Sequence, residues 1–222
     1  MHLMCHLGTD TLSWARRGAA VTGVDFSSRS IAAARSLADA VGLQATFLEA
    51  DVYGLEEVLS GPFDIIYASH GVLGWLPELE AWARLLSRFL REGGVLYLAD
   101  IHPFPLLFDR HDGAGSELRF KYPYLPAAEP LELPVVGSYA DRGAGVSISK
   151  QFRWPHSLGE LISAVARAPL RVEFLHEFPF MVYQGLSFLE RREDGLWWIS
   201  ESLGVSMPLS FSVKATKAGA DY

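Results

Sequence analysis

The sequence predicts an α/β fold of the doubly wound type, with one mostly parallel sheet between two layers of helices. Two observations lead to this prediction. Apolar segments rich in small and β-branched residues alternate with segments of helical period through the first hundred residues. The links between these segments are short. Alternation of this kind indicates parallel strands joined by right-handed crossovers.

The strands of the first half follow one another at regular intervals. We predict them at residues 1–5, 19–25 (AAVTGVD), 44–51 (QATFLEAD), 62–69 (PFDIIYAS) and 91–100 (REGGVLYLAD). In the last of these, the glycine pair Gly93–Gly94 ends the preceding helix and starts the fifth strand.

The helices between the strands carry recognisable end signals. Residues 10–17 read as a helix that stops at Gly18, and Ser27 caps a second helix that ends at Gly42. Pro77 suits the first turn of the next helix. Further along, Ser157-x-x-Glu160 forms a capping box, which predicts a helix over "HSLGELISAVARA".

Residues 103–155 differ from the rest of the chain. They hold seven of the twelve prolines and no long helical pattern. Within them "VSISKQFRW" (146–154) alternates like an antiparallel strand that "RFKYPY" (119–124) could join. We predict a lid or substrate insert over the carboxyl edge of the sheet. The closing strands are "LRVEFLHEF" and "PLSFSVKAT", and the whole chain, 1–222, reads as one domain.

Composition excludes several classes of function. The chain has 222 residues and a net charge of −7, without a cluster of Lys and Arg, which argues against nucleic acid or an anionic membrane as partner. No stretch of 18 apolar residues predicts a membrane span. The single cysteine, Cys5, excludes an internal disulfide and suits a cytoplasmic location. We therefore predict a small-molecule partner and a monomer or homodimer.

Two acids end successive predicted strands. In an open parallel sheet, ligands bind outside the carboxyl ends of the strands. Asp25 ends the second strand, where a carboxylate can accept hydrogen bonds from both hydroxyls of a ribose. Asp51 follows the third and could bind the amino group of an adenine, with Val52 beside the ring. Either acid alone could equally be a solvated loop residue, but together they favour an adenosine ligand.

Ordered segments of the chain resemble the class I S-adenosylmethionine-dependent methyltransferases. They are "GTDTLSWARRGAAVTGVDFS" (8–27), "FLEADVYGL" (47–55), "FDIIYASHGVLGWLPEL" (63–79) and "LREGGVLYL" (90–98). "WPHSLGELI" and "PLSFSVKA" are similar to a bacterial small-molecule branch of that family. The resemblance implies a Rossmann-like, seven-stranded sheet with an antiparallel last strand. It also implies methyl transfer from S-adenosylmethionine to an oxygen or nitrogen of a small-molecule acceptor.

The same resemblance implies roles for single residues. Gly8 would lie at the methionine end of the cofactor, Asp25 on its ribose, and Asp51 and Val52 at its adenine. Phe26 and Ser69 complete the cofactor-binding set that the resemblance implies.

The first strand departs from the family pattern D-x-G-x-G-x-G. His2 stands in place of the acid, Met4 and His6 replace two glycines, and Gly8 remains. Because glycine serves where φ is positive or where backbone approaches a ligand closely, we expect Met4 and His6 to crowd the cofactor or to push its turn outward. A dinucleotide site is disfavoured, since a pyrophosphate needs those glycines. A non-catalytic relative acting through protein contacts stays open as the alternative.

Histidines follow three of the predicted strands. His6, His70 and His102 come after the first, fourth and fifth, so we expect three imidazoles at one edge, with His102 or His70 as general base. Each could instead be a loop residue bonded to backbone. No metal site is predicted: His2, Cys5 and His6 lie close in sequence, but residues 2 and 5 point to opposite faces of a strand.

The chain begins inside its first predicted strand. Members of the resembled family carry one or more helices before this strand. We therefore expect the natural reading frame to extend upstream of Met1, or the chain to be a fragment with weak cofactor affinity.

Overall fold

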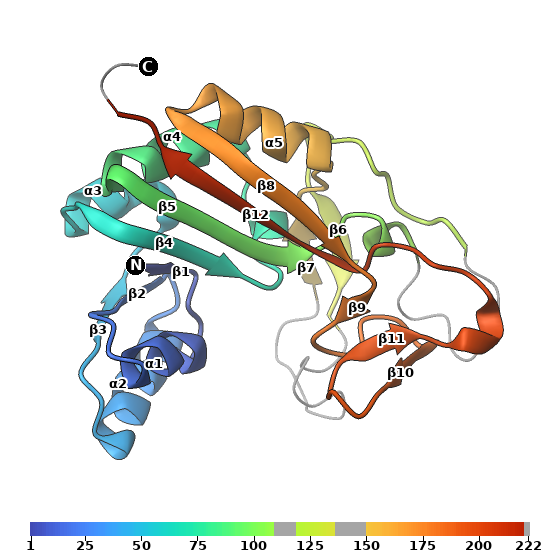
Figure 1. Ribbon diagram of the computed structural model, residues 1–222, viewed down its shortest axis with the longest axis horizontal. Coiled ribbons are helices and arrows are strands. Elements are labelled where there is room, and N and C mark those ends of the chain that lie inside the picture. The colour runs from blue at the N-terminus through green and yellow to red at the C-terminus, as the bar shows by residue number, and fades with distance from the viewer. Residues whose placement is uncertain (109–118, 136–149, 220–222) are drawn as a thin grey trace.

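The computed structural model describes residues 1–108, 119–135 and 150–219. Its main sheet has seven strands in the order β3-β2-β1-β4-β5-β12-β8 (Figure 1). The five strands of the first half are parallel, and β12 is antiparallel to both of its neighbours. The predicted doubly wound sheet with an antiparallel last strand is confirmed.

The strands of this sheet, in chain order, are β1 His2–Leu3, β2 Thr22–Asp25, β3 Thr46–Glu49, β4 Phe63–Ser69, β5 Leu90–Ile101, β8 Leu170–Phe178 and β12 Ser210–Lys217. The helices are α1 Thr9–Arg16, α2 Ser28–Val41, α3 Leu55–Val58, α4 Leu79–Phe89 and α5 Leu158–Arg167. Single 3₁₀ turns are η1 Val52–Gly54, η2 Leu73–Trp75, η3 Pro105–Leu107 and η4 Glu201–Leu203.

The first strand is shorter than predicted. It covers His2–Leu3 instead of residues 1–5. The physical reason is Met4, whose φ of 52° takes the backbone out of the extended region directly after Leu3. The β1 turn, which we define as Met4–Gly8, therefore begins earlier than the run of apolar letters indicates.

The predicted caps of two helices are present. The Ser27 hydroxyl accepts a hydrogen bond from Ser30 N at 3.2 Å, and α2 ends at Gly42 with φ 65°. The Ser157 hydroxyl accepts one from Glu160 N at 3.1 Å at the start of α5. Side-chain caps and a left-handed glycine thus bound these helices as the sequence indicated.

Two expectations around α4 were wrong. Pro77 precedes the helix, whose N-cap is Glu78, instead of lying in its first turn. The glycine pair does not end α4 either, because β5 begins at Leu90 and contains both glycines. A Cβ on Gly94 would lie 2.8 Å from the Arg91 carbonyl oxygen and 3.1 Å from that of Phe63. The pair therefore makes a tight irregularity inside β5, where its pairing with β4 changes register.

Helices cover the two faces of the sheet unequally (Figure 1). On one face, β1, β2, β4, β5 and β12 form the main core with α3, α4 and α5, and Trp82 of α4 is 1% exposed. On the other face, α1 and α2 pack over β1–β3 around Cys5, Ile31 and Phe47. The carboxyl ends of the parallel strands emerge beyond both layers.

The described parts of residues 103–155 include η3 and a two-stranded ladder of β6 (Leu131–Pro134) and β7 (Lys150–Arg153). The partner of β7 is thus β6 and not the segment 119–124, in which Phe120 forms a single bridge with Phe108. The start of the predicted strand, residues 146–149, lies outside the described residues.

A second small sheet was not predicted. It consists of β9 Phe180–Met181, β10 Leu189–Arg191 and β11 Trp197–Ile199, in the order β10-β11-β9. Its apolar residues form a separate cluster with Ile101 and Phe108 at the carboxyl end of β5. The strands are two or three residues long, too short for a period-two pattern to be recognised.

Candidate functional site

The order of the strands reverses at β1, which lies between β2 and β4. Ligands of open α/β sheets bind at such a switch point, outside the carboxyl ends of the strands. Among the described residues, the non-glycine residues with positive φ are Met4, His6 and His70. All three lie in the turns that follow β1 and β4. Such conformations cost about 1–2 kcal/mol per residue and concentrate at functional sites.

The β1 turn keeps the backbone path of a glycine-rich turn. The φ angles are 52° at Met4, 49° at His6 and 72° at Gly8, the three positions where the family pattern has glycine. The His6 side chain is exposed, and Met4 packs half-buried against the main core. The turn is therefore left-handed at each expected position, with two side chains added to it.

Gly8 has a packing role. A Cβ at this position would lie 2.7 Å from the Phe47 ring and 2.9 Å from the Ala34 side chain. The absence of a side chain at Gly8 lets the start of α1 approach α2 and β3 closely.

Asp25 ends β2 and holds the β1 turn. It is 7% exposed, and its Oδ2 accepts a hydrogen bond from His6 N at 2.8 Å while Oδ1 accepts one from Ser27 N at 2.9 Å. A carboxylate offers about four acceptor positions, so each oxygen keeps one for a further donor. The geometry leaves Asp25 able to accept two hydroxyl groups.

The other residues that we predicted at the adenosine differ in how far their side chains are exposed. Asp51 is exposed, and its Oδ1 accepts a hydrogen bond from Tyr53 N at 2.8 Å at the start of η1. Val52 is 9% exposed and belongs to the main core, whereas Phe26 is 67% exposed beside Asp25. Phe26 is thus the large apolar side chain that solvent or a ligand can reach here.

Ser69 connects the end of β4 to β1 and α1. Its hydroxyl lies 3.3 Å from His2 Nε2 and donates to Asp10 Oδ2 at 3.3 Å. On the other side of the same ring, His2 Nδ1 lies 2.7 Å from the Thr11 hydroxyl. Burial lowers the pKa of His2 to about 4. The charge of Asp10 acts to raise this pKa but offsets only part of the effect of burial, so the imidazole is neutral at pH 7. His2, which stands in place of the acid of the family pattern, is therefore uncharged and contacts the Thr11 and Ser69 hydroxyls through its two ring nitrogens.

The turn after β4, which we call the β4 turn and define as His70–Leu73, is held by Asp100 near the end of β5. Asp100 is 2% exposed, and its carboxylate accepts hydrogen bonds from Gly71 N, Val72 N and Leu73 N. Burial raises the pKa of Asp100, while the backbone donors act in the opposite direction. Sequence reasoning missed this residue, although the rule that pointed to Asp25, an acid at a strand end, applies to it equally.

The three predicted edge histidines do not share one environment. His6 and His70 are exposed on neighbouring turns, but His102 is 5% exposed. Its Nδ1 accepts a hydrogen bond from Phe104 N at 3.0 Å, and Nε2 lies 2.9 Å from Glu177 Oε1 in a geometry too poor for a regular hydrogen bond. Burial lowers the pKa of His102, although Glu177 acts the other way. Of the three predicted edge histidines, His6 and His70 are thus exposed and His102 is buried.

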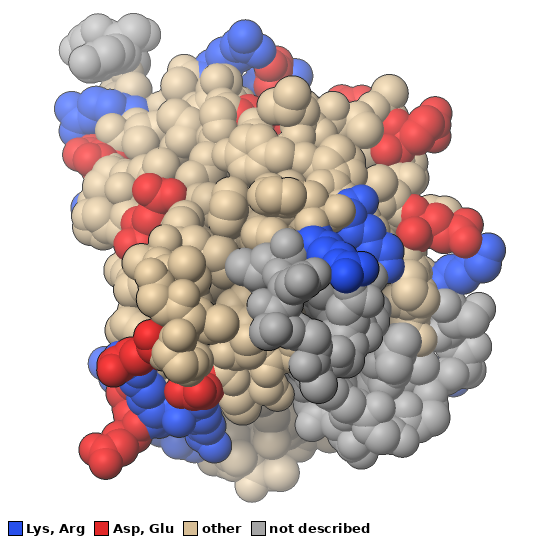
Figure 2. All heavy atoms as spheres, turned by 90° about the vertical axis from the view of Figure 1, so that its right-hand side faces the viewer, with Lys and Arg blue, Asp and Glu red and all other residues tan. Residues whose placement is uncertain are grey.

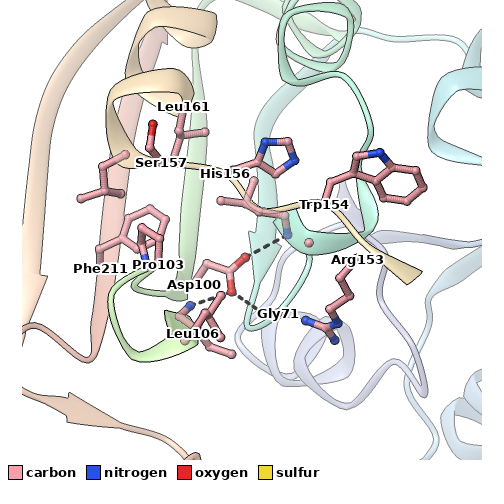
Figure 3. A pocket seen from close by; sticks show the side chains of 14 residues that line it. Gly71, Asp100, Pro103, Leu106, Arg153, Trp154, His156, Ser157, Leu161 and Phe211 are labelled. Carbon is pink, nitrogen blue, oxygen red and sulfur yellow. Dashed lines mark hydrogen bonds between the residues drawn. The ribbon is translucent and has the colours of Figure 1, made fainter. Parts of the chain in front are cut away.

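A small cavity of about 30 Å³ lies on the α5 side of the β4 turn. Its lining includes Gly71, Asp100 and Phe211 from the sheet region and Arg153 and Trp154 from the end of β7 (Figure 3). Trp154 N donates to Gly74 O at 2.9 Å. The insert after β5 thus contacts the segment that continues the β4 turn.

Figure 2 shows the side of the molecule that lies at the right of Figure 1, toward which β4 and β5 run. Where described residues form this face, uncharged side chains predominate, acidic groups lie mostly toward its margins, and one group of Lys and Arg lies near the middle. Within the described residues, no three His, Cys, Asp or Glu side chains are grouped so that they could hold a metal ion. None of the described helices combines the length and apolar character needed to cross a bilayer.

Residues 1–96 match a protein family described as a methyltransferase domain. This range contains β1 to β4 and the first half of β5, with both turns at the switch point. Among curated proteins, none matches the chain.

Solved structures share the fold over nearly the whole chain. An S-adenosylmethionine-dependent methyltransferase from Clostridium acetobutylicum has a TM-score of 0.66 at 12% identity, over 98% of this chain and 83% of that chain. One from Mesorhizobium loti has a TM-score of 0.63 at 21% identity, over 97% and 88%. The glycopeptide N-methyltransferase MtfA in complex with S-adenosylmethionine has a TM-score of 0.60 at 17% identity, over 98% and 80%. At these identities the likeness concerns the fold.

The methyltransferase-domain match over residues 1–96 and the fold of nearly the whole chain agree with the resemblance to the class I S-adenosylmethionine-dependent methyltransferases. At two of the glycine positions in the pattern of these methyltransferases, the chain carries Met4 and His6.

Proposed function

We propose that the protein transfers the methyl group of S-adenosylmethionine to an oxygen or nitrogen of a small-molecule acceptor. The observation that carries this proposal is the left-handed β1 turn held by the buried carboxylate of Asp25. A small acceptor fits the net charge of −7, because acidic macromolecules such as nucleic acids need concentrated positive charge.

The residues present fit the cofactor. Asp25 keeps one acceptor position on each oxygen for the two ribose hydroxyls. In the proposed arrangement Gly8 and the β1 turn lie at the methionine end, next to Ser69. Asp51, Val52 and Phe26 lie at the adenine, where the exposed Phe26 ring would lose its contact with water.

The cofactor supplies an activated sulfonium methyl group, so the protein has to align the acceptor and exclude competing water. His70 is the proposed general base, because it is exposed on the turn that follows β4. His102 remains a second candidate, but its burial and its contacts with Phe104 N and Glu177 leave it less accessible. We propose that residues 103–155 act as a lid or substrate insert, since β7 already contacts the segment after the β4 turn.

One observation favours a second function. Met4 and His6 add side chains to the turn where the family has glycine. If these side chains weaken or prevent the binding of S-adenosylmethionine, the protein is a non-catalytic relative that binds it weakly or not at all and acts through protein contacts.

Binding of S-adenosylhomocysteine tests the cofactor assignment, on which the proposed methyl transfer depends. At a hundredfold excess over its dissociation constant, the ligand should stabilise the folded protein by about 2.7 kcal/mol. Calorimetry and thermal unfolding measure this effect, with NAD as the control ligand. No binding at millimolar concentration would overturn the cofactor assignment for this chain.

Turnover separates the enzyme from the non-catalytic alternative. A panel of hydroxyl- and amine-bearing small molecules is incubated with methyl-labelled S-adenosylmethionine. Binding without transfer to any of them favours the alternative. On an accepted substrate, His70→Gln should lower turnover more than His102→Gln and leave cofactor affinity nearly unchanged. Loss of cofactor binding in either variant would assign that residue to the cofactor site.

A further inference from the structure

The β4 turn has a conformation that its residues do not favour. His70 has φ 49° and Gly71 has φ 94°, so two consecutive residues are left-handed directly after β4. A non-glycine residue in this region has an unfavourable contact between its Cβ and the backbone. The turn therefore needs interactions from outside itself to keep this shape.

Asp100 supplies those interactions. Its Oδ1 accepts hydrogen bonds from Gly71 N and, at 2.6 Å, from Ile101 N, and its Oδ2 accepts from Val72 N and Leu73 N, both at 3.1 Å. Figure 3 shows the carboxylate turned toward the turn that contains Gly71. These four donors use the acceptor capacity of a carboxylate. Asp100 thus has no free hydrogen-bond acceptor position with which to bind a ligand or to take a proton from the methyl acceptor.

The β4 turn lies between the cofactor side and the insert. On the side of β1, the preceding residue Ser69 contacts His2 and Asp10. On the other side, the Gly74 carbonyl accepts a hydrogen bond from Trp154 N, and the Arg153 guanidinium lies 4.6 Å from the Trp75 ring. A change in the turn would therefore reach both the cofactor and the segment that covers the acceptor.

We propose that Asp100 is a positioning residue of the methyltransferase, which holds the β4 turn in the conformation that cofactor binding requires. It acts through the backbone of Gly71, Val72 and Leu73 and does not touch the reacting atoms. This inference rests on the proposed function, because the crevice beside the turn is taken as the cofactor site.

The test is Asp100→Asn, which keeps the size of the side chain but directs an NH2 group at backbone N–H donors. Loss of these charge-assisted hydrogen bonds should raise the dissociation constant of S-adenosylhomocysteine about tenfold. Hydrogen exchange at the amides of the β4 turn should accelerate by about the same factor. Asp100→Ser, which retains one acceptor oxygen, is measured in parallel in case the Asn variant does not fold.

The control for a general loss of stability is Leu170→Ala, at the opposite end of the sheet in the main core. It should lower the melting temperature and leave ligand affinity of the folded protein unchanged. Adding His70→Gly to Asp100→Asn should restore at least half of the lost affinity, because glycine adopts positive φ without the steric cost.

The outcomes separate the two proposals. If the wild-type protein does not bind S-adenosylhomocysteine, the proposed function fails. If it binds, and Asp100→Asn or Asp100→Ser binds equally well with unchanged exchange at the β4 turn, the positioning role of Asp100 is overturned. A loss of affinity that His70→Gly does not restore would also contradict the role, since it would not act through the turn.

Discussion

The β1 turn and the β4 turn border the same switch point and are built alike. Each contains left-handed residues, and each is anchored by a buried aspartate from the strand beside it, Asp25 for the first and Asp100 for the second. They differ in how many backbone donors the carboxylate accepts. Asp25 accepts two and is 7% exposed, whereas Asp100 accepts four and is 2% exposed.

This difference underlies the two roles that we propose, ligand binding for Asp25 and positioning for Asp100. A buried acid with unused acceptor positions can bind a hydroxyl-bearing ligand, while one whose positions are all used by the backbone only fixes the chain. Both aspartates are buried and lie near strand ends, so these properties do not distinguish the two roles. The number of backbone N–H groups that donate to each carboxylate does distinguish them.

The largest effect is expected at Gly8, which tests whether the β1 turn depends on packing as well as on conformation. In Gly8→Ala the new Cβ would lie 2.7 Å from the Phe47 ring, at φ 72°. Overpacking and the left-handed backbone together should cost about 2–4 kcal/mol in the free energy of unfolding, measured by urea denaturation. The control is Gly42→Ala, at φ 65° with nothing within 4 Å of the Cβ, which should show the smaller conformational cost alone. Equal losses would mean that packing at Gly8 contributes nothing.

His2, which lies between the Thr11 and Ser69 hydroxyls, should make the free energy of unfolding depend on pH. Burial lowers the pKa of His2 to about 4, while the unfolded chain has the ordinary value near 6.5. Between these two pH values the unfolded state binds a proton at His2 and the folded state does not. The free energy of unfolding therefore falls as pH decreases from about 6.5 to 4. The loss from this one group should approach about 3 kcal/mol.

Urea unfolding at several pH values checks this effect. His2→Gln should have a shallower slope between pH 4 and 6.5 than the wild type. His176→Gln, at an exposed position on β8, is the matched control and should keep the wild-type slope. An unchanged slope in His2→Gln would show that the pKa of His2 does not differ between the folded and unfolded states.

The proposed ligand capacity of Asp25 can be tested by removing its carboxylate. Asp25→Ala should weaken S-adenosylhomocysteine binding at least about tenfold, because the ribose hydroxyls would lose charge-assisted hydrogen bonds. Calorimetry measures the change. Asp39→Ala, an exposed acid on α2, is the control. Equal affinities in the two variants would remove Asp25 from the cofactor site.

The smallest effect concerns the strain at His6. Because His6 is exposed with φ 49°, His6→Gly should raise the free energy of unfolding by about 0.5–1 kcal/mol, the steric relief less the entropy of glycine. Met4→Gly should show no such gain, since Met4 packs against the main core. A loss of stability in His6→Gly would indicate that its side chain makes contacts that outweigh the strain.

Much of the fold could be read from local patterns. The period of the apolar residues separated strands from helices, and Ser27, Gly42 and Ser157 marked helix ends because a cap acts within its own turn. Local patterns were misleading where distant chain decides the outcome. The glycine pair Gly93–Gly94 reads as a helix stop, but β5 pairs with β4 on both sides of it, so that the pair lies inside the strand.

Within the site, the residues at strand ends were accessible to sequence reasoning, and the state of each side chain was not. Asp25 and Ser69 end their strands and His70 follows β4 as expected, and a parallel sheet brings successive strand ends to one edge. The left-handed backbone at Met4 and His6 runs against the preference of both residues. It arises from the strand pairing and from Asp25, which no local pattern shows.

The order and type of the elements of the parallel half therefore follow from the sequence itself, because these depend on the period of apolar residues and on signals within single turns. The burial of His102, the four backbone donors on Asp100, and the neutral His2 between Thr11 and Ser69 follow only from the tertiary structure. Each depends on groups brought together from distant parts of the chain. The strength of a hydrogen bond and the size of a pKa shift depend on these neighbouring groups and not on the residue type alone.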